Sequence, residues 1–388
     1  MKMQLPQEDG SLLAYHVKGE PVGLAVAGRA FNREAYAAAH VVVDPIASGN
    51  SGRTPVVIDW DATLAFREYL WSHGFKVAEA MDTAQRGMGL DWPEARELIQ
   101  RSVRHAKTRG GGIACGVGTD QLSAERDYTL AEIEAAYLEQ LDVVEAEGGD
   151  VILMASRALA RAARNADDYL TLYGRLLDRA SRPVILHWLG EMFDPSLAGY
   201  WGSATLSAAL DTVVTLIAAH ADKVDGIKVS LLDPQWEVAL RRRLPASVKM
   251  YTGDDFNYAD MIAGDEHGHS HALLGIFDPI ASVAAAALER LAAGDVSAFR
   301  SLLDPTVELS REIFRSPTQY YKSGVVFLAW LNGHQEHFSM VAGAQSARGV
   351  AHYAKVFQLA DACGALRDPN LACERLASYL RVACGISV

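Results

Sequence analysis

One lysine of this sequence lies near the end of an apolar segment, where lysines are rare. Lys228 belongs to Val-Asp-Gly-Ile-Lys-Val-Ser. In an extended strand alternate side chains point the same way, so Lys228 shares a face with Gly226 and Ser230. If that face is buried, the pKa of the amine falls, and an uncharged amine can attack a carbonyl carbon to form a Schiff base. The alternative is a structural lysine paired with Asp225 or another nearby carboxylate.

Other polar residues follow other apolar segments at similar positions. Their side chains include carboxylates, hydroxyls, guanidinium groups and an imidazole, which bind substrates and transfer protons. They can act together only if the fold brings the ends of these segments to one place. They are Asp44, Asp82, Thr83, Arg86, Asp120, Ser156, Arg157, His187, Glu191, Ser230, Thr252, Gly253, Asp254, Asp255 and Asp278.

The segments themselves predict such a fold. From residue 36 onward, eight short apolar segments alternate with amphipathic stretches of helical spacing, such as 60–73, 92–105, 130–147 and 204–220. This alternation predicts a parallel sheet covered by helices, and eight units predict an α/β (β/α)₈ TIM barrel. Catalytic groups of such barrels lie at the carboxyl ends of the strands. The expected strands are 37–43, 76–81, 112–117, 150–155, 183–188, 224–229, 248–252 and 272–277.

The two ends of the chain do not follow this rhythm. We expect residues 36–293 to form the barrel and residues 1–35 to form an N-terminal extension, in which 12–17 is one arm of a hairpin that caps the barrel. Residues 294–388 are expected to be a helical region packed on the barrel, with helices at 307–314, 320–331, 351–362 and 371–382. Helical appendages of this kind often build subunit interfaces.

Composition argues against several classes of protein. The formal net charge is −12, and the only basic run is residues 241–243, so no nucleic-acid partner is expected. No apolar run reaches the length of a membrane span, and the first residues do not resemble a signal peptide. The four cysteines form no Cys-x-x-Cys pair, which is typical of a reducing compartment. We therefore expect a cytoplasmic protein without a membrane partner.

Several short motifs occur in a recognisable order. They are Gly-Val-Gly at 116–118, Pro-Val-Ile-Leu-His at 183–187, Gly-Ile-Lys at 226–228, Tyr-Thr-Gly-Asp-Asp at 251–255, Ala-Gly-Asp at 293–295 and Tyr-Lys at 321–322. From residue 37 to 333 the sequence resembles the dihydrodipicolinate synthase/N-acetylneuraminate lyase family of class I aldolases, as a divergent branch. The resemblance implies that Lys228 forms a Schiff base with a small-molecule carbonyl substrate. It also implies that no cofactor is needed and that the chain assembles as a homodimer or homotetramer.

The sequence also departs from that family. Asp82-Thr83-Ala84 stands where the family has Gly-Thr-Thr, so one hydroxyl is missing and a carboxylate would repel an anionic substrate group. His187 replaces a proton-relaying tyrosine, and Ala155-Ser156-Arg157 replaces a tyrosine pair. We therefore expect a lyase, an aldolase or dehydratase, that acts on a 2-oxo acid or sugar-derived carbonyl compound and not in dihydrodipicolinate synthesis itself.

Each candidate residue has a functional and a structural interpretation. His187, with an unperturbed pKa near 6.5, is either the acid/base or a buried histidine bonded to a loop. Thr83 is expected to bind substrate. Asp82 either binds a sugar hydroxyl, acts as a base, or pairs with Arg86 or Arg157.

The remaining substrate-binding candidates are Arg157, Gly253, Asp254 and Ser230. Arg157 could bind a substrate carboxylate through two nitrogens and so replace the missing hydroxyl. Asp254 either caps the next helix or contacts substrate together with Gly253. Ser230 shares the face of Lys228.

Three histidines, His267, His269 and His271, suggest a metal site. However, they precede the eighth strand, which places them opposite the expected active site, so we predict a solvated or adventitiously metal-binding loop and no metal in the active site. Two other functions remain open. One is a metal-dependent barrel isomerase or hydrolase, with ligands among Asp82, Asp120, His187, Asp254 and Asp278; the other is a non-catalytic barrel that binds a small molecule.

Overall fold

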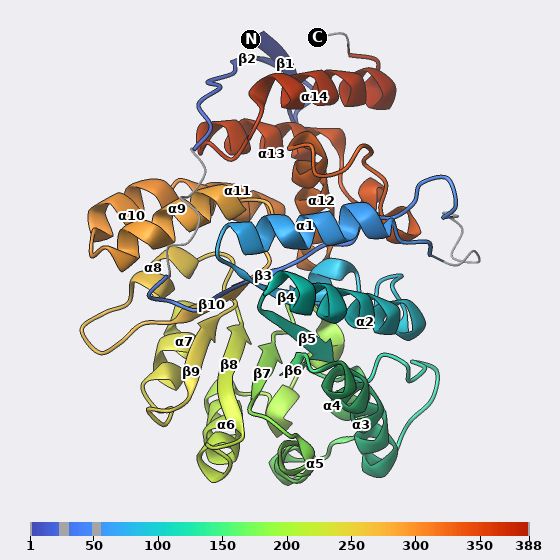
Figure 1. Cartoon of the computed structure of the whole chain (residues 1–388), viewed down its shortest axis with the longest axis vertical. Helices are drawn as coiled ribbons and strands as arrows, with labels where there is room; N and C mark the ends of the chain where they lie inside the picture. The colour runs from blue at the N-terminus through green and yellow to red at the C-terminus, as the bar shows by residue number, and fades with distance from the viewer. Residues whose placement is uncertain (1, 23–30, 49–55, 387–388) are drawn as a thin grey trace.

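In the computed structural model, which describes residues 2–22, 31–48 and 56–386, eight parallel strands close into a barrel (Figure 1). The strand order is β10-β3-β4-β5-β6-β7-β8-β9, and β10 pairs with both β9 and β3. This confirms the predicted (β/α)₈ architecture. The strands are β3 (Ala35–Ala38), β4 (Lys76–Glu79), β5 (Ile113–Val117), β6 (Asp150–Leu153), β7 (Val184–Leu189), β8 (Val224–Ser230), β9 (Lys249–Thr252) and β10 (His271–Leu274).

Helices cover the outside of this barrel, and their ends carry the expected signals. Asp59 caps the first of them, and Thr129 with Glu132 forms a capping box at the start of another. Gly148 ends that helix in the left-handed conformation. The helices are α1 (Trp60–Ser72), α2 (Trp92–Arg109), α3 (Leu130–Glu147), α4 (Arg157–Ala162), α5 (Ala166–Arg179), α6 (Leu206–Ala219), α7 (Pro234–Arg241), α8 (Tyr258–Ala263) and α9 (Ala281–Ala292).

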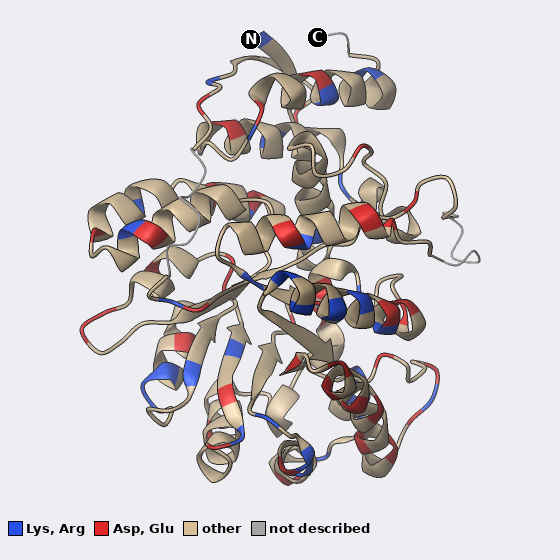
Figure 2. Ribbon diagram, viewed as in Figure 1, with Lys and Arg blue, Asp and Glu red and all other residues tan. Residues whose placement is uncertain are grey.

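Charged residues of both signs are interspersed on these helices (Figure 2). Ion pairs such as Arg104–Glu147 join neighbouring helices. The ion pair of Arg67 with Glu79, by contrast, is fully buried. Arg67 of α1 donates from Nε and Nη2 to the carboxylate of Glu79 at the end of β4, each at 2.9 Å. Arg67 Nη1 also donates to the carbonyls of His40 and Thr63, and Glu79 Oε1 accepts the N–H of Ala80. This pair fixes the end of β4.

Side chains fill the barrel interior at the amino ends of the strands. Tyr36 and Tyr251 lie in the interior cluster, and the Tyr251 hydroxyl donates to Asp225 Oδ2 at 2.7 Å. Lys249 Nζ donates to Asp225 Oδ1 at 2.9 Å and also pairs with Glu34. Among the described residues, these contacts fill the interior at the amino ends of the strands.

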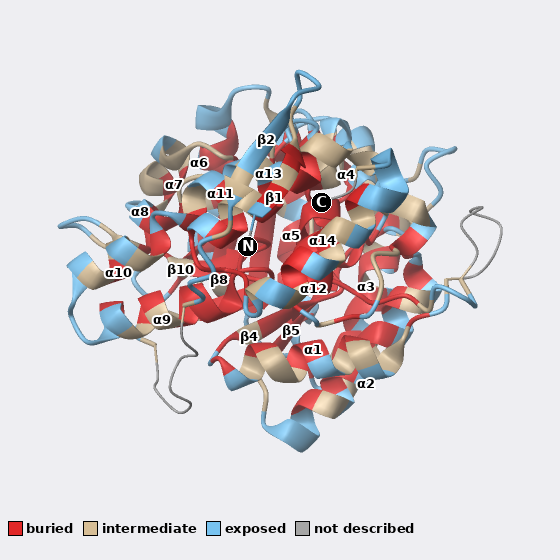
Figure 3. Ribbon diagram, turned by 90° about the horizontal axis from the view of Figure 1, so that it is seen from above, coloured by how far each residue is buried: buried red, intermediate tan, exposed pale blue. Residues whose placement is uncertain are grey.

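The C-terminal helices are α10 (Val296–Leu303), α11 (Thr306–Ile313), α12 (Tyr321–Leu331), α13 (Val350–Ala362) and α14 (Pro369–Cys384). All residues of α12 are buried, and in Figure 3 buried segments gather around it at the centre of the view. This helix joins the barrel to α13 and α14, which lie with both chain ends at the top of Figure 1. The C-terminal region therefore reaches the mouth of the barrel through α12.

The N-terminal extension forms an antiparallel hairpin of β1 (Lys2–Pro6) and β2 (Leu12–His16). It packs on α13: the Tyr15 hydroxyl donates to Asp361 Oδ2 at 2.7 Å, and the N–H of Lys18 donates to the same oxygen. The expectation that this hairpin caps the barrel was therefore wrong. It covers the C-terminal helices instead, because they present the carboxylate and apolar face that it contacts.

Within the described residues, no single helix combines the length and the apolar composition of a membrane span. The bent pair Pro195–Gly202 and Leu206–Ala219 meets both criteria only when its two segments are taken together.

Candidate active site

Lys228 lies on β8 with its side chain in the barrel interior, and the residue is 7% exposed. Its Nζ forms no hydrogen bond or ion pair with any residue that the structure describes. Asp225, the partner of the structural alternative, is bound by Lys249 and Tyr251. Burial lowers the pKa of Lys228, and the negative charges of Asp255 and Asp82 partly oppose this shift. The amine is therefore buried and has no polar partner among the described residues.

Gly253 makes room for this lysine. A Cβ atom at position 253 would lie 2.7 Å from Lys228 Cε and 2.8 Å from the Val229 carbonyl oxygen, and it would also collide with Ser230 Oγ. Such distances are far below van der Waals contact. The structure thus explains Gly253 by the space that Lys228 and Ser230 occupy, which differs from the expected contact with substrate.

We predict that Gly253→Ala slows Schiff-base formation by roughly 10²-fold, because the added methyl group displaces the Lys228 side chain by a large fraction of an ångström. The rate of hydride-trapped adduct formation would measure this. Gly349→Ala is the control, since a Cβ at position 349 meets nothing within 4 Å. An unchanged rate in a folded Gly253→Ala protein would contradict the prediction.

A small pocket adjoins Lys228, with a volume of about 10 Å³, room for about one water molecule. Phe314 and Tyr321 stack over it, with ring centroids 4.3 Å apart, and Phe193 packs edge-on to both. Asp255 lines the pocket and accepts the N–H of Ile276 at 2.9 Å. Burial raises the pKa of Asp255 to about 7. The aromatic side chains therefore shield both Lys228 and a carboxyl group that titrates near neutrality.

Tyr321, the first residue of α12, donates to or accepts from Thr83: the two hydroxyl oxygens are 2.8 Å apart. Thr83 also lines the Lys228 pocket, as expected of a substrate-binding residue. Burial raises the pKa of Tyr321 well above 10, so its phenol keeps its proton at neutral pH. A hydroxyl pair able to pass protons thus lies beside the amine.

His187 of β7 is the register neighbour of Lys228 on β8. Its Nε2 lies 3.3 Å from Ser230 Oγ, while Nδ1 is buried without a partner among the described residues. Burial, and secondarily the charge of Lys228, lowers the pKa of His187 well below 6.5. The ring therefore favours its neutral form.

Asp82 begins the 3₁₀ helix η1 (Asp82–Ala84) and lines three adjoining cavities, including the Lys228 pocket. Its carboxylate has no hydrogen-bond or ion-pair partner in the described parts of the chain. The expected pairing with Arg86 or Arg157 does not occur: Arg86 pairs with Asp120 at 2.6 Å, and Arg157 pairs with Asp194 at 2.5 Å. Asp82 is therefore available to a ligand.

The contacts of Asp254 do not match the expectation that it binds substrate together with Gly253. Its Oδ1 accepts the N–H groups of Phe256 and Asn257 at 2.8 and 3.1 Å, and Oδ2 accepts the Asn257 side-chain amide. Both oxygens are thus engaged in capping the following turn. Its neighbour Asp255 instead lines the same pocket as Lys228.

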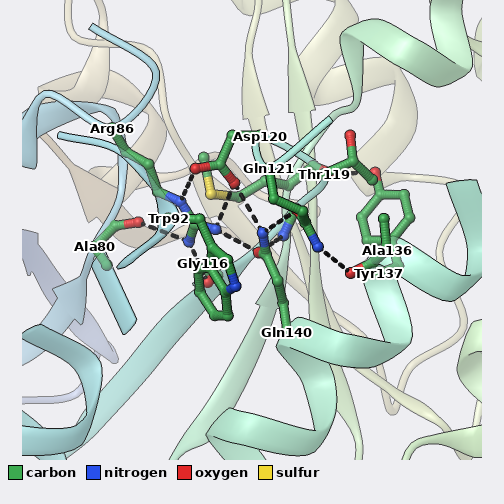
Figure 4. A network of polar contacts seen from close by, with 12 residues as sticks. Ala80, Arg86, Trp92, Gly116, Thr119, Asp120, Gln121, Ala136, Tyr137 and Gln140 are labelled. Atoms are coloured by element: carbon green, nitrogen blue, oxygen red, sulfur yellow. Dashed lines mark hydrogen bonds and ion pairs between the residues drawn. The ribbon is translucent and has the colours of Figure 1, made fainter. Parts of the chain in front are cut away.

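Arg86 is the centre of a polar network that includes both oxygens of Asp120 (Figure 4). Its Nη1 donates to the carbonyls of Gly116 (2.6 Å) and Ala80 (3.4 Å), and Nη2 also donates to Gln140. All five N–H groups of its guanidinium are therefore satisfied. Arg86 joins the loops after β4 and β5 to α3 and has no donor left for a substrate.

Two larger cavities open beside the Lys228 pocket, with volumes of about 360 and 200 Å³. His187 lines the larger one, Lys322 lines the smaller one, and Asp82, Arg157 and Leu189 line both. The space needed for a small-molecule substrate is therefore present, next to the buried amine.

A family model described as "Protein of unknown function (DUF993)" matches residues 3–386. The chain belongs to the DUF993 family. No curated protein sequence matches it. This DUF993 chain is also similar in fold to three solved structures, one of them a complex with pyruvate, although sequence identity is low.

The first structure is dihydrodipicolinate synthase from Aquifex aeolicus, with 14% identity, a TM-score of 0.59, and coverage of 78% of this chain and 89% of that one. The second is dihydrodipicolinate synthase from Oceanobacillus iheyensis, with 15% identity, a TM-score of 0.57, and coverage of 81% and 88%. The third is YagE, a prophage protein of the dihydrodipicolinic acid synthase family from E. coli K12 in complex with pyruvate, with 13% identity, a TM-score of 0.63, and coverage of 91% and 99%. The fold of the DUF993 chain is thus that of the family that its motifs resemble.

His267 and His269, in the loop between α8 and β10, and His271, the first residue of β10, lie at the amino end of that strand, opposite the pocket of Lys228. Among the described residues, no group of three or more His, Cys, Asp or Glu side chains is arranged to hold a metal ion.

Sequence reasoning missed Tyr321 and Lys322 as site residues of the DUF993 chain. Both belong to α12, which follows the barrel, so the rule that strand ends carry the chemistry does not reach them. The available signal was a lysine and a tyrosine at the start of an apolar helix, where a charged residue at a buried position needs an explanation.

Proposed function

We propose that the protein is a Schiff-base-forming lyase, an aldolase or dehydratase, with Lys228 as its nucleophile and a small carbonyl compound as its substrate. The observation that carries the proposal is the buried Lys228 amine, which has no carboxylate partner within ion-pair distance among the described residues. It lies at the open end of the barrel, beside a pocket that leads to larger cavities. The fold shared with dihydrodipicolinate synthases supports this chemistry.

The reaction begins when the Lys228 lone pair attacks the carbonyl carbon. The carbonyl oxygen takes up protons and leaves as water, and a protonated imine remains. In an aldolase the bond between the α- and β-carbons then breaks: its electron pair forms the C=C bond of an enamine while the imine π pair moves to nitrogen, and the β-carbon, whose hydroxyl loses its proton, leaves as a second carbonyl compound. In a dehydratase the α-carbon loses a proton to give the enamine, and the β-hydroxyl is protonated and leaves as water. Reprotonation of the enamine and addition of water release the product and restore the amine.

Four neighbouring side chains can assist these steps. The hydroxyl pair of Thr83 and Tyr321 supplies and removes the protons of the departing oxygen, because the Tyr321 phenol remains protonated. The free carboxylate of Asp82 accepts the proton of a substrate hydroxyl next to the bond that breaks. Asp255, with a pKa of about 7, exchanges protons with the imine end.

The substrate differs from that of dihydrodipicolinate synthesis. Asp82 and Asp255 flank Lys228, and no basic residue other than Lys228 lines its pocket in the described part of the chain. A carboxylate next to the carbonyl carbon would meet like charge there. Between a 2-oxo acid and a sugar-derived carbonyl compound, the sugar-derived one is therefore favoured.

Borohydride trapping tests the proposal. Incubation of the protein with a panel of sugar-derived aldehydes, ketones and 2-oxo acids, followed by reduction and peptide mass mapping, should give a stable adduct on Lys228. A panel that leaves Lys228 unmodified while the protein remains folded would refute it.

The contacts of the suggested metal ligands support a metal-dependent hydrolase or isomerase less well than they support the lyase. Three of the suggested ligands are engaged elsewhere: Asp120 with Arg86, Asp254 with the turn that it caps, and Asp278 with His40, whose Nδ1 lies 2.8 Å from Asp278 Oδ2. A non-catalytic binding barrel would need no unpaired buried amine, which costs stability.

We predict that Tyr321→Phe lowers kcat by about 10²- to 10⁴-fold while KM changes little, because phenylalanine keeps the stacking on Phe314 but cannot pass a proton. Steady-state kinetics on the trapped substrate would measure both constants. Tyr379→Phe, on the distant helix α14, is the matched control. Loss confined to KM would instead indicate that Tyr321 only binds substrate.

A further inference from the structure

The cavity of about 200 Å³ is lined by basic side chains whose N–H groups are not all engaged in hydrogen bonds with described residues. Arg86, Arg157 and Lys322 line it, together with the carboxylates Asp82 and Asp194. The N–H groups of Arg86 are all engaged in the network of Figure 4. The donors that remain for a ligand belong to Arg157 and Lys322.

Lys322 lies in the first turn of α12 and is 5% exposed. Its Nζ donates to the Gln319 carbonyl at 3.1 Å and makes a weak contact of 3.3 Å with Met88 Sδ, and no described carboxylate lies within ion-pair distance. Burial lowers the pKa of Lys322 to about 8; the charge of Asp82 partly opposes this shift, and that of Arg157 adds to it. A buried ammonium group without a paired anion is costly, unless a ligand supplies the anion.

Arg157 presents the end of its guanidinium to the same cavity. Its Nε donates to Asp194 Oδ2 at 2.5 Å, whereas Nη1 and Nη2 form no hydrogen bond with described residues. The group lies over Gly87, where an added Cβ would be 3.2 Å from Nη1. Two cations thus share a cavity while both Nη groups remain available, an arrangement that suits an oxyanion.

The distribution of charge along the connected cavities is uneven. Carboxylates flank the carbonyl position at Lys228, and Lys322 and the two Nη groups of Arg157 lie in the next cavity, with Asp82 lining both spaces. A substrate that fits this pattern is uncharged at its carbonyl end, has a hydroxyl group near Asp82, and carries its negative charge at the far end.

We propose that Lys322 and Arg157 form a subsite for a terminal oxyanion, a phosphoryl or carboxylate group, on a hydroxylated aldehyde or ketone. The position of the carbonyl rests on the proposed Schiff-base function, but the anion subsite itself does not depend on that chemistry. Lys322 serves as a point charge, and the fork of Arg157 fixes the orientation of the oxyanion.

Calorimetric titration of the full chain with inorganic phosphate at pH 7 and low salt tests the subsite. We expect saturable binding, at least about ten-fold weaker in Lys322→Met and in Arg157→Met, because each variant removes charge-assisted hydrogen bonds. Lys228→Met and the exposed-lysine control Lys107→Met should bind phosphate like the wild type. Arg157 is half exposed, so its variant remains informative if Lys322→Met fails to fold.

Two further experiments identify the anion and connect it to the carbonyl substrate. Titration with acetate distinguishes the two anions: tighter binding of phosphate identifies a phosphoryl group, and tighter binding of acetate identifies a carboxylate. Borohydride trapping with dihydroxyacetone and with its phosphate should give half-maximal adduct at a lower concentration of the phosphorylated ketone.

The inference is overturned if phosphate and acetate both fail to bind, or if their binding is the same in wild type, Lys322→Met and Arg157→Met. Anion binding without any trapped adduct would support this subsite and refute the lyase. An adduct on Lys228 without anion binding would support the lyase and refute the subsite.

Discussion

Replacing Lys228 with methionine should abolish borohydride trapping and reduce turnover by on the order of 10⁴- to 10⁶-fold, the usual cost of losing a covalent nucleophile. Methionine has a similar volume and no charge, so the free energy of unfolding should stay the same or rise. Mass mapping of the reduced protein and chemical denaturation would measure the two effects.

The matched control for this variant is Lys107→Met, on the outer surface of α2, which should retain full trapping. An adduct that persists in Lys228→Met and maps to Lys322, the other buried lysine of the site, would show that the nucleophile has been wrongly assigned.

The pH dependence of trapping has a defined sign. Only the uncharged amine attacks a carbonyl, so the rate should rise with pH as Lys228 loses its proton. Burial lowers the pKa of Lys228 from 10.5, and the midpoint of this rise should therefore lie below 10.5. A midpoint at or above that value would mean that the amine is solvated.

The second large effect concerns stability. Arg67→Met should lower the free energy of unfolding by about 3–5 kcal/mol, because it leaves the Glu79 carboxylate buried without its cation. Since Glu79 ends β4, three residues before Asp82, trapping at Lys228 should fall as well. Urea denaturation followed by circular dichroism would give the first quantity.

Two comparisons separate this prediction from a general loss of packing. Arg67→Met with Glu79→Met should recover most of the stability, because the isolated charge is removed. Arg104→Met, which breaks the exposed pair with Glu147, should cost no more than about 1 kcal/mol. Wild-type stability in the single Arg67 variant would show that Glu79 finds another partner or takes up a proton.

The alternating strands and helices of the barrel were predictable from the sequence. Each strand of a parallel barrel is a continuous apolar segment, and each helix has apolar residues at helical spacing. Lys228 could be singled out for the same reason, since a lysine interrupts such a segment only at a special position. The choice between Asp254 and Asp255 was not predictable. It depends on which of two adjacent carboxylates turns toward Lys228 and which caps the next turn.

Contacts between distant parts of the chain were also beyond the sequence. The bond of Tyr321 to Thr83 joins residues 238 positions apart, and no local pattern specifies it. The hairpin at the N-terminus lies on α13 for a similar reason: the acceptor of Tyr15 is Asp361, 346 positions later. Partners of this kind follow from tertiary packing, not from periodicity.

The position of Tyr321 and Lys322 on α12 has a consequence for biosynthesis. All eight strands, and with them Lys228, leave the ribosome before α12 is translated. A nascent chain that stops after α9 therefore holds the amine without Phe314, Tyr321 or Lys322. Under the proposed function, we expect catalytic competence to appear late in translation, when α12 docks.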